Sequence, residues 1–247
     1  MIPLSVLALG RIPYAEALAL QRALREDRIT GKIDRDVLLL LEHEPTVTLG
    51  RGTRPTSLPL PPEELARRGL TVMEVERGGD VTWHGPGQLV GYPILDLDQH
   101  RPDLHWYLRQ LEQALIGALL TIGIHAERNP GLTGVWTRGR KIASVGVHVR
   151  RWVTTHGFAL NVMNDLADFG LIVPCGIPGV EMTTVARELG DSAARRQACP
   201  ERKRGGGSTL WDEAMAAVVE SFGRVFERQP VAATMAELLP EGTGLRL

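Results

Sequence analysis

Apolar residues recur along the chain with two periods, which predict a mixture of strands and helices. A continuous apolar run at 37–41 is typical of a buried strand, and the apolar run from Leu89 to Leu97 predicts a strand at 88–95. Leucines at helical spacing make 103–122 the clearest helix, with Asp103 as its N-cap and Gly123 just beyond its end. Further strands are predicted at 3–9, 47–50, 70–76, 80–84, 133–137, 141–149 and 152–162, and further helices at 14–27, 63–68, 183–189 and 208–226.

The order of these elements predicts the fold class. Strands and helices alternate without a strict β-α-β rhythm, so we expect an α/β (α+β) fold with a mixed β-sheet and helices packed on it. The chain has 247 residues, of which 43% are hydrophobic and 23% are charged, so it has enough apolar material for a core, and its length allows one large α/β domain or two small ones. We expect a single domain to cover 1–229, with a mobile insertion rich in Gly, Ser, Ala, Arg and Lys at 190–207 and a C-terminal tail at 230–247. Ser208 is the expected cap of the last helix.

Net charge, apolar run length and cysteine content indicate which partners and which cellular compartment to expect. The formal net charge is −1, so the whole-chain charge favours neither nucleic acid nor a membrane surface. No run of about 18 apolar residues could span a bilayer, and the first ten residues do not read as a signal peptide. The two cysteines, Cys175 and Cys199, are too few for a disulfide framework. We therefore expect a protein of the reducing cytoplasm without nucleic-acid or membrane partners.

The stretch from Arg77 to Gly91, RGGDVTWHGPGQLVG, places five glycines around a single histidine. Glycine allows positive φ and close approach of the backbone, so such a loop can present N–H groups to a ligand. His84 is the side chain in it that can exchange a proton near neutral pH. The other interpretation is a tight hairpin between strands 70–76 and 88–95, with the histidine merely exposed.

Two later segments carry further candidate chemistry. Lys141 begins an alternating strand with small residues at 143, 144 and 146, and Cys175 stands between Pro174 and Gly176 in an apolar setting. Backbone N–H groups after the cysteine are expected to face an oxyanion, as acyl transfer requires. The structural alternatives are a small buried hydrophobe for Cys175 and a solvated strand-edge lysine for Lys141.

The remaining histidines and basic residues are less specific. His148 and His156 are interpreted as ordinary strand histidines, Cys199 as an incidental thiol, and no spacing indicates a zinc site, so no metal is expected. Six basic residues occur between 128 and 156 without an intervening acid: Arg128, Arg138, Arg140, Lys141, Arg150 and Arg151. They predict a cationic face for an anionic partner, unless acids elsewhere in the chain pair with them.

Four segments occur in this order along the chain: RGGDVTWHGPGQ from Arg77, RKIASVG from Arg140, HGFALN from His156 and PCGI from Pro174. Together they resemble the octanoyltransferases of lipoate biosynthesis. The resemblance covers about 3–189 and the final helix; the insertion and the tail lie outside the pattern. It implies a fold like that of lipoate- and biotin–protein ligases. It also implies transfer of an octanoyl group from acyl carrier protein, through a cysteine thioester, to a lysine on lipoyl domains.

The same resemblance implies a catalytic pair, Cys175 and Lys141, and no cofactor. The acceptors it implies are the lipoyl domains of 2-oxoacid dehydrogenase complexes and the glycine cleavage H protein. Substrate-binding residues are expected to be Arg77, Gly78, Gly79, Asp80, Val81, Thr82, Trp83, His84, Ser144, Val145, Gly146, Gly157, Phe158 and Ala159. The preference for eight carbons comes from the resemblance alone.

Elementary electrostatics agrees with such a pair. A free thiol is only a few per cent thiolate at neutral pH. An ammonium about 4 Å away favours the thiolate by up to about 4 kcal/mol at an effective dielectric constant of about 20. The Cys175 thiolate would attack the carrier thioester without ATP, and glycine N–H groups from 77–87 would line the acyl carbonyl. Lys141, or else His84, would take the proton of the incoming amine.

Two other functions compete with this interpretation. An ATP-dependent lipoate or biotin ligase of the same fold would hold an acyl-adenylate with a lysine and a glycine-rich loop, and would not need Cys175. A non-catalytic module would only bind acyl carrier protein or lipoyl domains. The cysteine between proline and glycine argues against the first, and the presence of Lys141, Cys175 and His84 together argues against the second.

Overall fold

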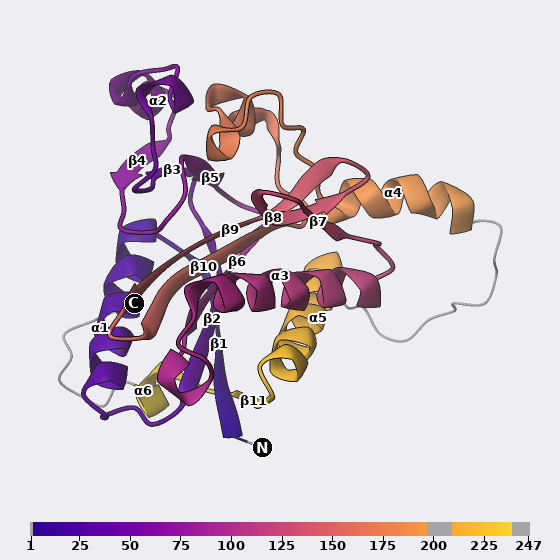
Figure 1. The fold of residues 1–247 in the computed structure, drawn as a ribbon. Coiled ribbons are helices and arrows are strands. Elements are labelled where there is room, and N and C mark those ends of the chain that lie inside the picture. Colours follow the sequence, from indigo (N-terminus) through magenta and orange to yellow (C-terminus); the bar gives the residue numbers. More distant parts are fainter. Residues whose placement is uncertain (1, 197–208, 239–247) are drawn as a thin grey trace.

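The computed structural model describes residues 2–196 and 209–238, and a mixed β-sheet lies at its centre (Figure 1). Within these residues the sheet has eight strands in the order β11-β1-β2-β6-β10-β9-β8-β7. β11, β1 and β2 run parallel, whereas all pairs from β2 to β7 are antiparallel. The expected mixed sheet is confirmed. Its strands are β1 (Ile2–Ile12), β2 (Asp36–His43), β6 (Gln88–Ile94), β7 (Glu127–Asn129), β8 (Leu132–Thr137), β9 (Arg140–Arg150), β10 (Val153–Asn161) and β11 (Arg228–Ala232).

Helices cover both faces of this sheet. The helix α1 (Tyr14–Ile29) packs on one face, and α3 (Leu104–Thr121) and α5 (Leu210–Val225) pack on the other (Figure 1). Because side chains alternate along a strand, Leu38 and Leu40 of β2 join the α3–α5 core while Leu39 and Leu41 join the α1 core. Burial on both faces explains the continuous apolar run in the sequence. None of the helices in the described ranges combines the length and apolarity needed to cross a membrane.

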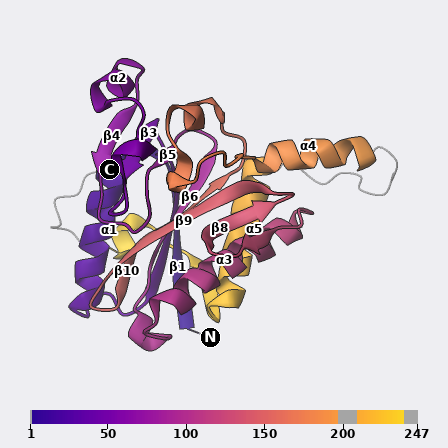
Figure 2. The same cartoon turned by 45° about the horizontal axis from the view of Figure 1, so that its top comes forward.

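A second, smaller sheet lies beside the large one and positions the candidate site. Within the described residues its strands have the order β4-β3-β5, and the short helix α2 lies in the connection between β3 and β4. The segment that contains η3 and η4 packs against it around Trp83 and Phe169, at the top of Figures 1 and 2. These elements are β3 (Thr46–Leu49), β4 (Thr71–Glu74), β5 (Thr82–His84), α2 (Pro62–Arg67), η1 (Pro55–Ser57), η3 (Ala167–Leu171) and η4 (Pro174–Gly176).

The structure corrects the expected organisation after residue 189. The helix α4 (Val185–Arg196) continues beyond Leu189 into the expected insertion, and 197–207 lie outside the described residues. Helix α5 is capped by Thr209, not Ser208, through a reciprocal pair of hydrogen bonds with Asp212. The boundary expected after 229 falls inside β11, which pairs with β1 before the short helix α6 (Met235–Leu238).

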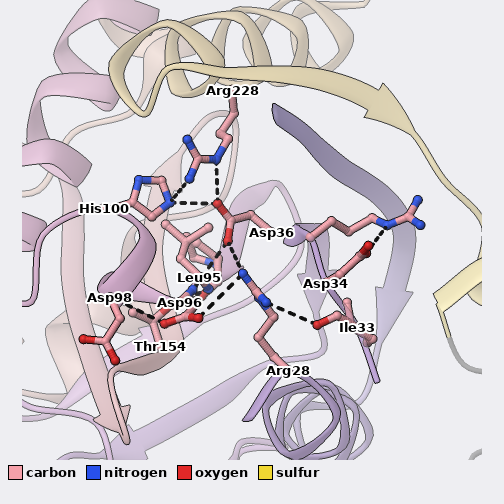
Figure 3. A network of polar contacts seen from close by, with 12 residues as sticks. Arg28, Ile33, Asp34, Asp36, Leu95, Asp96, Asp98, His100, Thr154 and Arg228 are labelled. Atoms are coloured by element: carbon pink, nitrogen blue, oxygen red, sulfur yellow. Dashed lines mark hydrogen bonds and ion pairs between the residues drawn. The ribbon is translucent and has the colours of Figure 1, made fainter. Parts of the chain in front are cut away.

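A buried charged network joins β11 to the centre of the fold (Figure 3). Asp36, at the start of β2, accepts a hydrogen bond from Arg228 Nε at 2.8 Å and lies 2.7 Å from His100 Nε2. Arg28, near the end of α1, lies between Asp36 and Asp96 at 3.7 and 3.8 Å. Burial raises the pKa of Asp36, but its hydrogen bonds and the charges of His100 and Arg228 outweigh burial, so its pKa is lowered. This charge therefore stabilises the fold above about pH 3.9, and the contribution is lost as the pH falls through the lowered value.

Candidate active site

Lys141 and Cys175, 34 positions apart in sequence, meet at one side of the large sheet. Lys141 Nζ donates to Cys175 Sγ at 3.0 Å and to the carbonyl oxygen of Thr133 at 3.2 Å. The ammonium also lies 4.9 Å from the ring centroid of Trp136, within cation–π range. The lysine is 0% exposed, whereas the cysteine is partly exposed. The interpretation of Lys141 as a solvated strand-edge lysine is therefore wrong.

The backbone around Lys141 explains how a lysine can be so deeply buried. Its N–H donates to Glu181 O and its carbonyl accepts from Thr183 N, so the segment before α4 lies along the first residues of β9. Gly134 on the neighbouring strand β8 has φ +134°, and a Cβ there would lie 2.8 Å from Lys141 Cε. Only glycine leaves room for the lysine stem to pass this strand.

Cys175 lies in a turn whose backbone is already hydrogen-bonded. Its φ is 57°, in the left-handed region, and its N–H donates to Val81 O at 2.9 Å. The N–H groups of Gly176 and Ile177 donate within the same turn at 2.9 and 3.1 Å. The expectation that N–H groups after the cysteine face an oxyanion is therefore wrong. The hydroxyl of Ser144 lies 3.8 Å from the sulfur, and either atom can be the donor of this contact.

The Arg77 loop is a cover over β9 and not a hairpin. Arg77 is buried, and its guanidinium donates to Asp80 O at 2.7 Å and to Thr48 O and Oγ1 at 2.8 Å. The next N–H, of Gly78, donates to Val147 O on β9 at 2.9 Å. Burial lowers the pKa of Arg77. The guanidinium therefore stabilises the loop by joining it, through Asp80, to Thr48 on β3.

His84 is buried and both of its ring nitrogens have partners. Its Nδ1 donates to Gln88 Oε1 at 2.9 Å, an orientation fixed because the Gln88 amide nitrogen donates to two other oxygens. Its Nε2 lies 3.4 Å from Thr48 Oγ1. Burial, and then the charges of His43 and Arg77, hold the pKa of His84 well below its usual value. The expectation of an exposed histidine is wrong, and this neutral ring is poorly suited to accept the proton of an incoming amine.

A cavity of about 220 Å³ opens beside the cysteine. Among the residues expected to bind substrate, those that line it are Arg77, Gly79, Asp80, Thr82, His84, Ser144, Val145, Gly146, Gly157, Phe158 and Ala159. Gly78, Val81 and Trp83 do not line it. Gly78 hydrogen-bonds to β9, Val81 supports the Cys175 turn, and Trp83 packs edge to face on Phe169.

Known proteins that are similar in sequence identify the family of this chain. The lipoyl protein ligase A/B catalytic domain matches residues 13–201. An octanoyltransferase of Geobacter sulfurreducens is 54% identical over 76% of this chain and 76% of its own, and one of Acidobacterium capsulatum is 44% identical over 96% of both. The chain belongs to the octanoyltransferase family. It is an acyltransferase of lipoate biosynthesis, as the four sequence segments indicated.

Solved structures extend the likeness of this octanoyltransferase at the level of the fold. A lipoate-protein ligase A bound with ATP has a TM-score of 0.71 at 14% identity and covers 96% of this chain and 91% of its own. A bi-partite lipoate protein ligase from Thermoplasma acidophilum has a TM-score of 0.66 at 17% identity, with 96% and 89% covered. The expected lipoate-ligase-like fold is confirmed.

Several pocket residues of the octanoyltransferase were missed by sequence reasoning. Tyr14, Tyr92 and His156 line the cavity, and Tyr14 Oη lies 3.3 Å from His156 Nδ1. Burial raises the pKa of Tyr14 to about 12, so its hydroxyl stays protonated. His156 has φ 56° within β10, which is unusual for a strand residue. In the sequence, only the position of His156 at the start of the segment HGFALN could have indicated that it lines the cavity. Gly131, Leu132, Thr133 and Ile177 complete the lining.

The cationic face expected between 128 and 156 is largely neutralised. Arg128, Arg140 and Arg150 each have a nitrogen within 3.1 Å of a glutamate oxygen, from Glu112, Glu188 and Glu26 respectively. Arg138 also lies 3.5 Å from Glu188. The alternative, in which acids elsewhere in the chain pair with these arginines, therefore holds for these four residues. The acids come from α1, α3 and α4, which is why the local sequence concealed them.

Substitution of Gly176 is expected to disturb the cysteine turn. A Cβ at Gly176 would collide with the Asp80 carboxylate, which accepts from Ser57 Oγ and Val81 N at 2.7 Å each. We expect Gly176→Ala to cost about 1–3 kcal/mol more than its backbone strain alone, and to lower octanoyl transfer at least tenfold. Urea unfolding and initial rates measure the two effects.

Gly179→Ala is the matched control for Gly176→Ala. Gly179 has a similar φ of +72°, but nothing lies within 4 Å of an added Cβ. Its substitution carries only the left-handed strain of about 1–2 kcal/mol. Equal effects of the two variants would contradict the role given to the Asp80 contact.

Proposed function

We propose that this octanoyltransferase takes its octanoyl group from acyl carrier protein, carries it as a thioester on Cys175, and delivers it to a lysine ε-amine on a lipoyl domain. The observation that carries the proposal is the 3.0 Å contact between Lys141 Nζ and Cys175 Sγ. A desolvated ammonium so close to a sulfur favours the thiolate, which is the nucleophilic form. The lipoyl domains of 2-oxoacid dehydrogenase complexes and the glycine cleavage H protein are the proposed acceptors, in the cytoplasm.

In the first step the Cys175 thiolate attacks the carbonyl carbon of the carrier thioester. The new S–C bond forms as the bond to the carrier sulfur breaks, and Lys141 gives its proton to the departing carrier thiolate. The Ser144 hydroxyl, 3.8 Å from the cysteine sulfur, donates to the developing oxyanion. One thioester replaces another, so the exchange needs no ATP.

In the second step the neutral acceptor amine attacks the Cys175 thioester. The amide C–N bond forms, the cysteine thiolate leaves, and Lys141 accepts the proton lost by the amine. This restores the initial ammonium–thiolate pair. Besides the sulfur, Lys141 Nζ contacts Thr133 O at 3.2 Å and the Trp136 ring at 4.9 Å, and neither contact depends on the state of the sulfur.

The cavity beside Cys175 is the proposed site of the acyl chain. Leu132, Val145, Phe158, Ala159 and Ile177 give it apolar walls. Each methylene buried there contributes about 0.8 kcal/mol, so two carbons change affinity by roughly fifteenfold. Rates with carrier thioesters of different chain lengths would measure this preference.

The test is transfer from octanoyl–acyl carrier protein to a purified lipoyl domain in the absence of ATP. We expect amide product, and an octanoyl adduct that peptide mass spectrometry places on Cys175 when the acceptor is withheld. The shared fold with a lipoate-protein ligase A makes the ATP-dependent reaction the second candidate. Product from free octanoate only when ATP is added would support that candidate and overturn the proposal. Binding of both partners without any adduct or product would indicate a non-catalytic module.

A further inference from the structure

One peptide unit, between Thr133 and Gly134, lies between Lys141 and a buried glutamate. Its carbonyl oxygen accepts from Lys141 Nζ at 3.2 Å. Its N–H donates to Glu112 Oε1 at 3.0 Å. The carboxylate of α3 and the ammonium of β9 thus bind opposite ends of the same amide group, and Lys141 in turn holds Cys175 Sγ at 3.0 Å.

Glu112 is fixed as firmly as the lysine it faces. It is 0% exposed, and its other oxygen, Oε2, accepts from Arg109 Nη1 at 2.6 Å and Arg128 Nε at 3.1 Å. Both arginines are partly exposed, so they cover the carboxylate from the solvent side. A buried carboxylate held by these hydrogen bonds keeps its position, and Oε1 remains directed at the amide.

We propose that Glu112 is a positioning residue for Lys141 that acts through the Thr133–Gly134 peptide. Gly134 has φ +134°, a backbone conformation that glycine alone adopts readily, so this amide plane would be comparatively free to rotate without a partner. The hydrogen bond from its N–H to a carboxylate holds the plane and strengthens the carbonyl as an acceptor. Rotation of the amide would remove one of the two hydrogen bonds that aim the ammonium at the sulfur.

The inference rests on the proposed role of the Lys141–Cys175 pair, so its test includes that pair. The full chain with Cys199→Ser leaves Cys175 as the single thiol. In that background we would compare Glu112→Ala and Glu112→Gln with Lys141→Met. The measurements are the pH midpoint of iodoacetamide alkylation at Cys175, and kcat and KM for octanoyl–acyl carrier protein.

We expect Glu112→Ala to raise the alkylation midpoint by about one pH unit, equivalent to a tenfold lower rate near pH 6–7. kcat should fall by about the same factor, with KM for the donor changed by less than about twofold, because Glu112 does not line the pocket. Glu112→Gln should lie between wild type and Glu112→Ala, since an amide oxygen can still accept the Gly134 N–H without a full charge. If the alanine variant fails to fold, the glutamine variant decides.

Asp36→Asn controls for a general loss of stability. Asp36 is also a buried carboxylate held by arginines, and none of the labelled residues of its network lines the pocket (Figure 3). We expect Asp36→Asn to be less stable than wild type but to keep the wild-type pH midpoint of Cys175 alkylation. A midpoint moved by Lys141→Met but unmoved by the folded Glu112 variants would overturn the inference and leave the proposed function standing. A midpoint unmoved by Lys141→Met as well would overturn both.

Discussion

Cys175→Ala is expected to abolish octanoyl transfer, with a fall in rate of at least about 10³-fold, because the variant has no group that can carry the acyl chain. Among the residues that the structure describes, the partly exposed sulfur has polar contacts with Lys141 and Ser144, and its turn is held by backbone hydrogen bonds that alanine keeps. The variant should therefore fold, with a loss of about 1–3 kcal/mol for the ammonium left without its sulfur. Transfer assays and circular dichroism measure the two quantities.

Cys199→Ser is the matched control for this substitution. Cys199 is the second thiol of the chain and belongs to none of the four matched segments. We expect transfer by this variant within about twofold of wild type and an unchanged adduct on Cys175. Transfer by a folded Cys175→Ala variant within tenfold of wild type would show that the acyl group passes directly from donor to acceptor.

Much of the large sheet could be predicted from the sequence because its signal is local. The run Val37–Leu41 is buried on both faces, and helix α3 shows both its spacing and its Asp103 cap, which accepts from Trp106 N at 3.0 Å. β11 could not be predicted in the same way. It is a short edge strand with one neighbour, β1, and is anchored by Arg228 to Asp36, 192 positions away.

In the candidate site, too, some features could be predicted from the sequence, whereas others depend on contacts between distant residues. The contact between Cys175 and Lys141 could be expected from the resemblance to a family. The carboxylate behind Lys141 could not, because Glu112 lies on a helix and reaches the lysine only through a peptide of another strand. The expected oxyanion donors failed for a local reason, since the Cys175 turn uses its own N–H groups internally. Hydrogen-bond satisfaction within a turn depends on backbone angles such as φ 57° at a non-glycine residue, which residue types do not reveal.

Lys141→Met is expected to have the second largest effect, a fall in transfer of about 10²- to 10³-fold at pH 7. Methionine has a similar length, so the stem can still pass Gly134, and a neutral side chain leaves no uncompensated charge in the core. The variant should therefore fold. It loses an electrostatic stabilisation of the thiolate of up to about 4 kcal/mol and the group that moves the proton.

The pH dependence of this variant distinguishes its two losses. Without the ammonium the sulfur must ionise unaided, so alkylation of Cys175 should be slow at pH 6–7 and recover above about pH 8.5. Transfer should recover less than alkylation does, because high pH restores the thiolate but not the proton donor for the carrier sulfur. Lys32→Met is the matched control, since the side chain of Lys32 is 73% exposed and pairs only with Asp27 in the described residues. Parallel pH profiles of Lys141→Met, Lys32→Met and wild type would show that the 3.0 Å contact does not ionise the nucleophile.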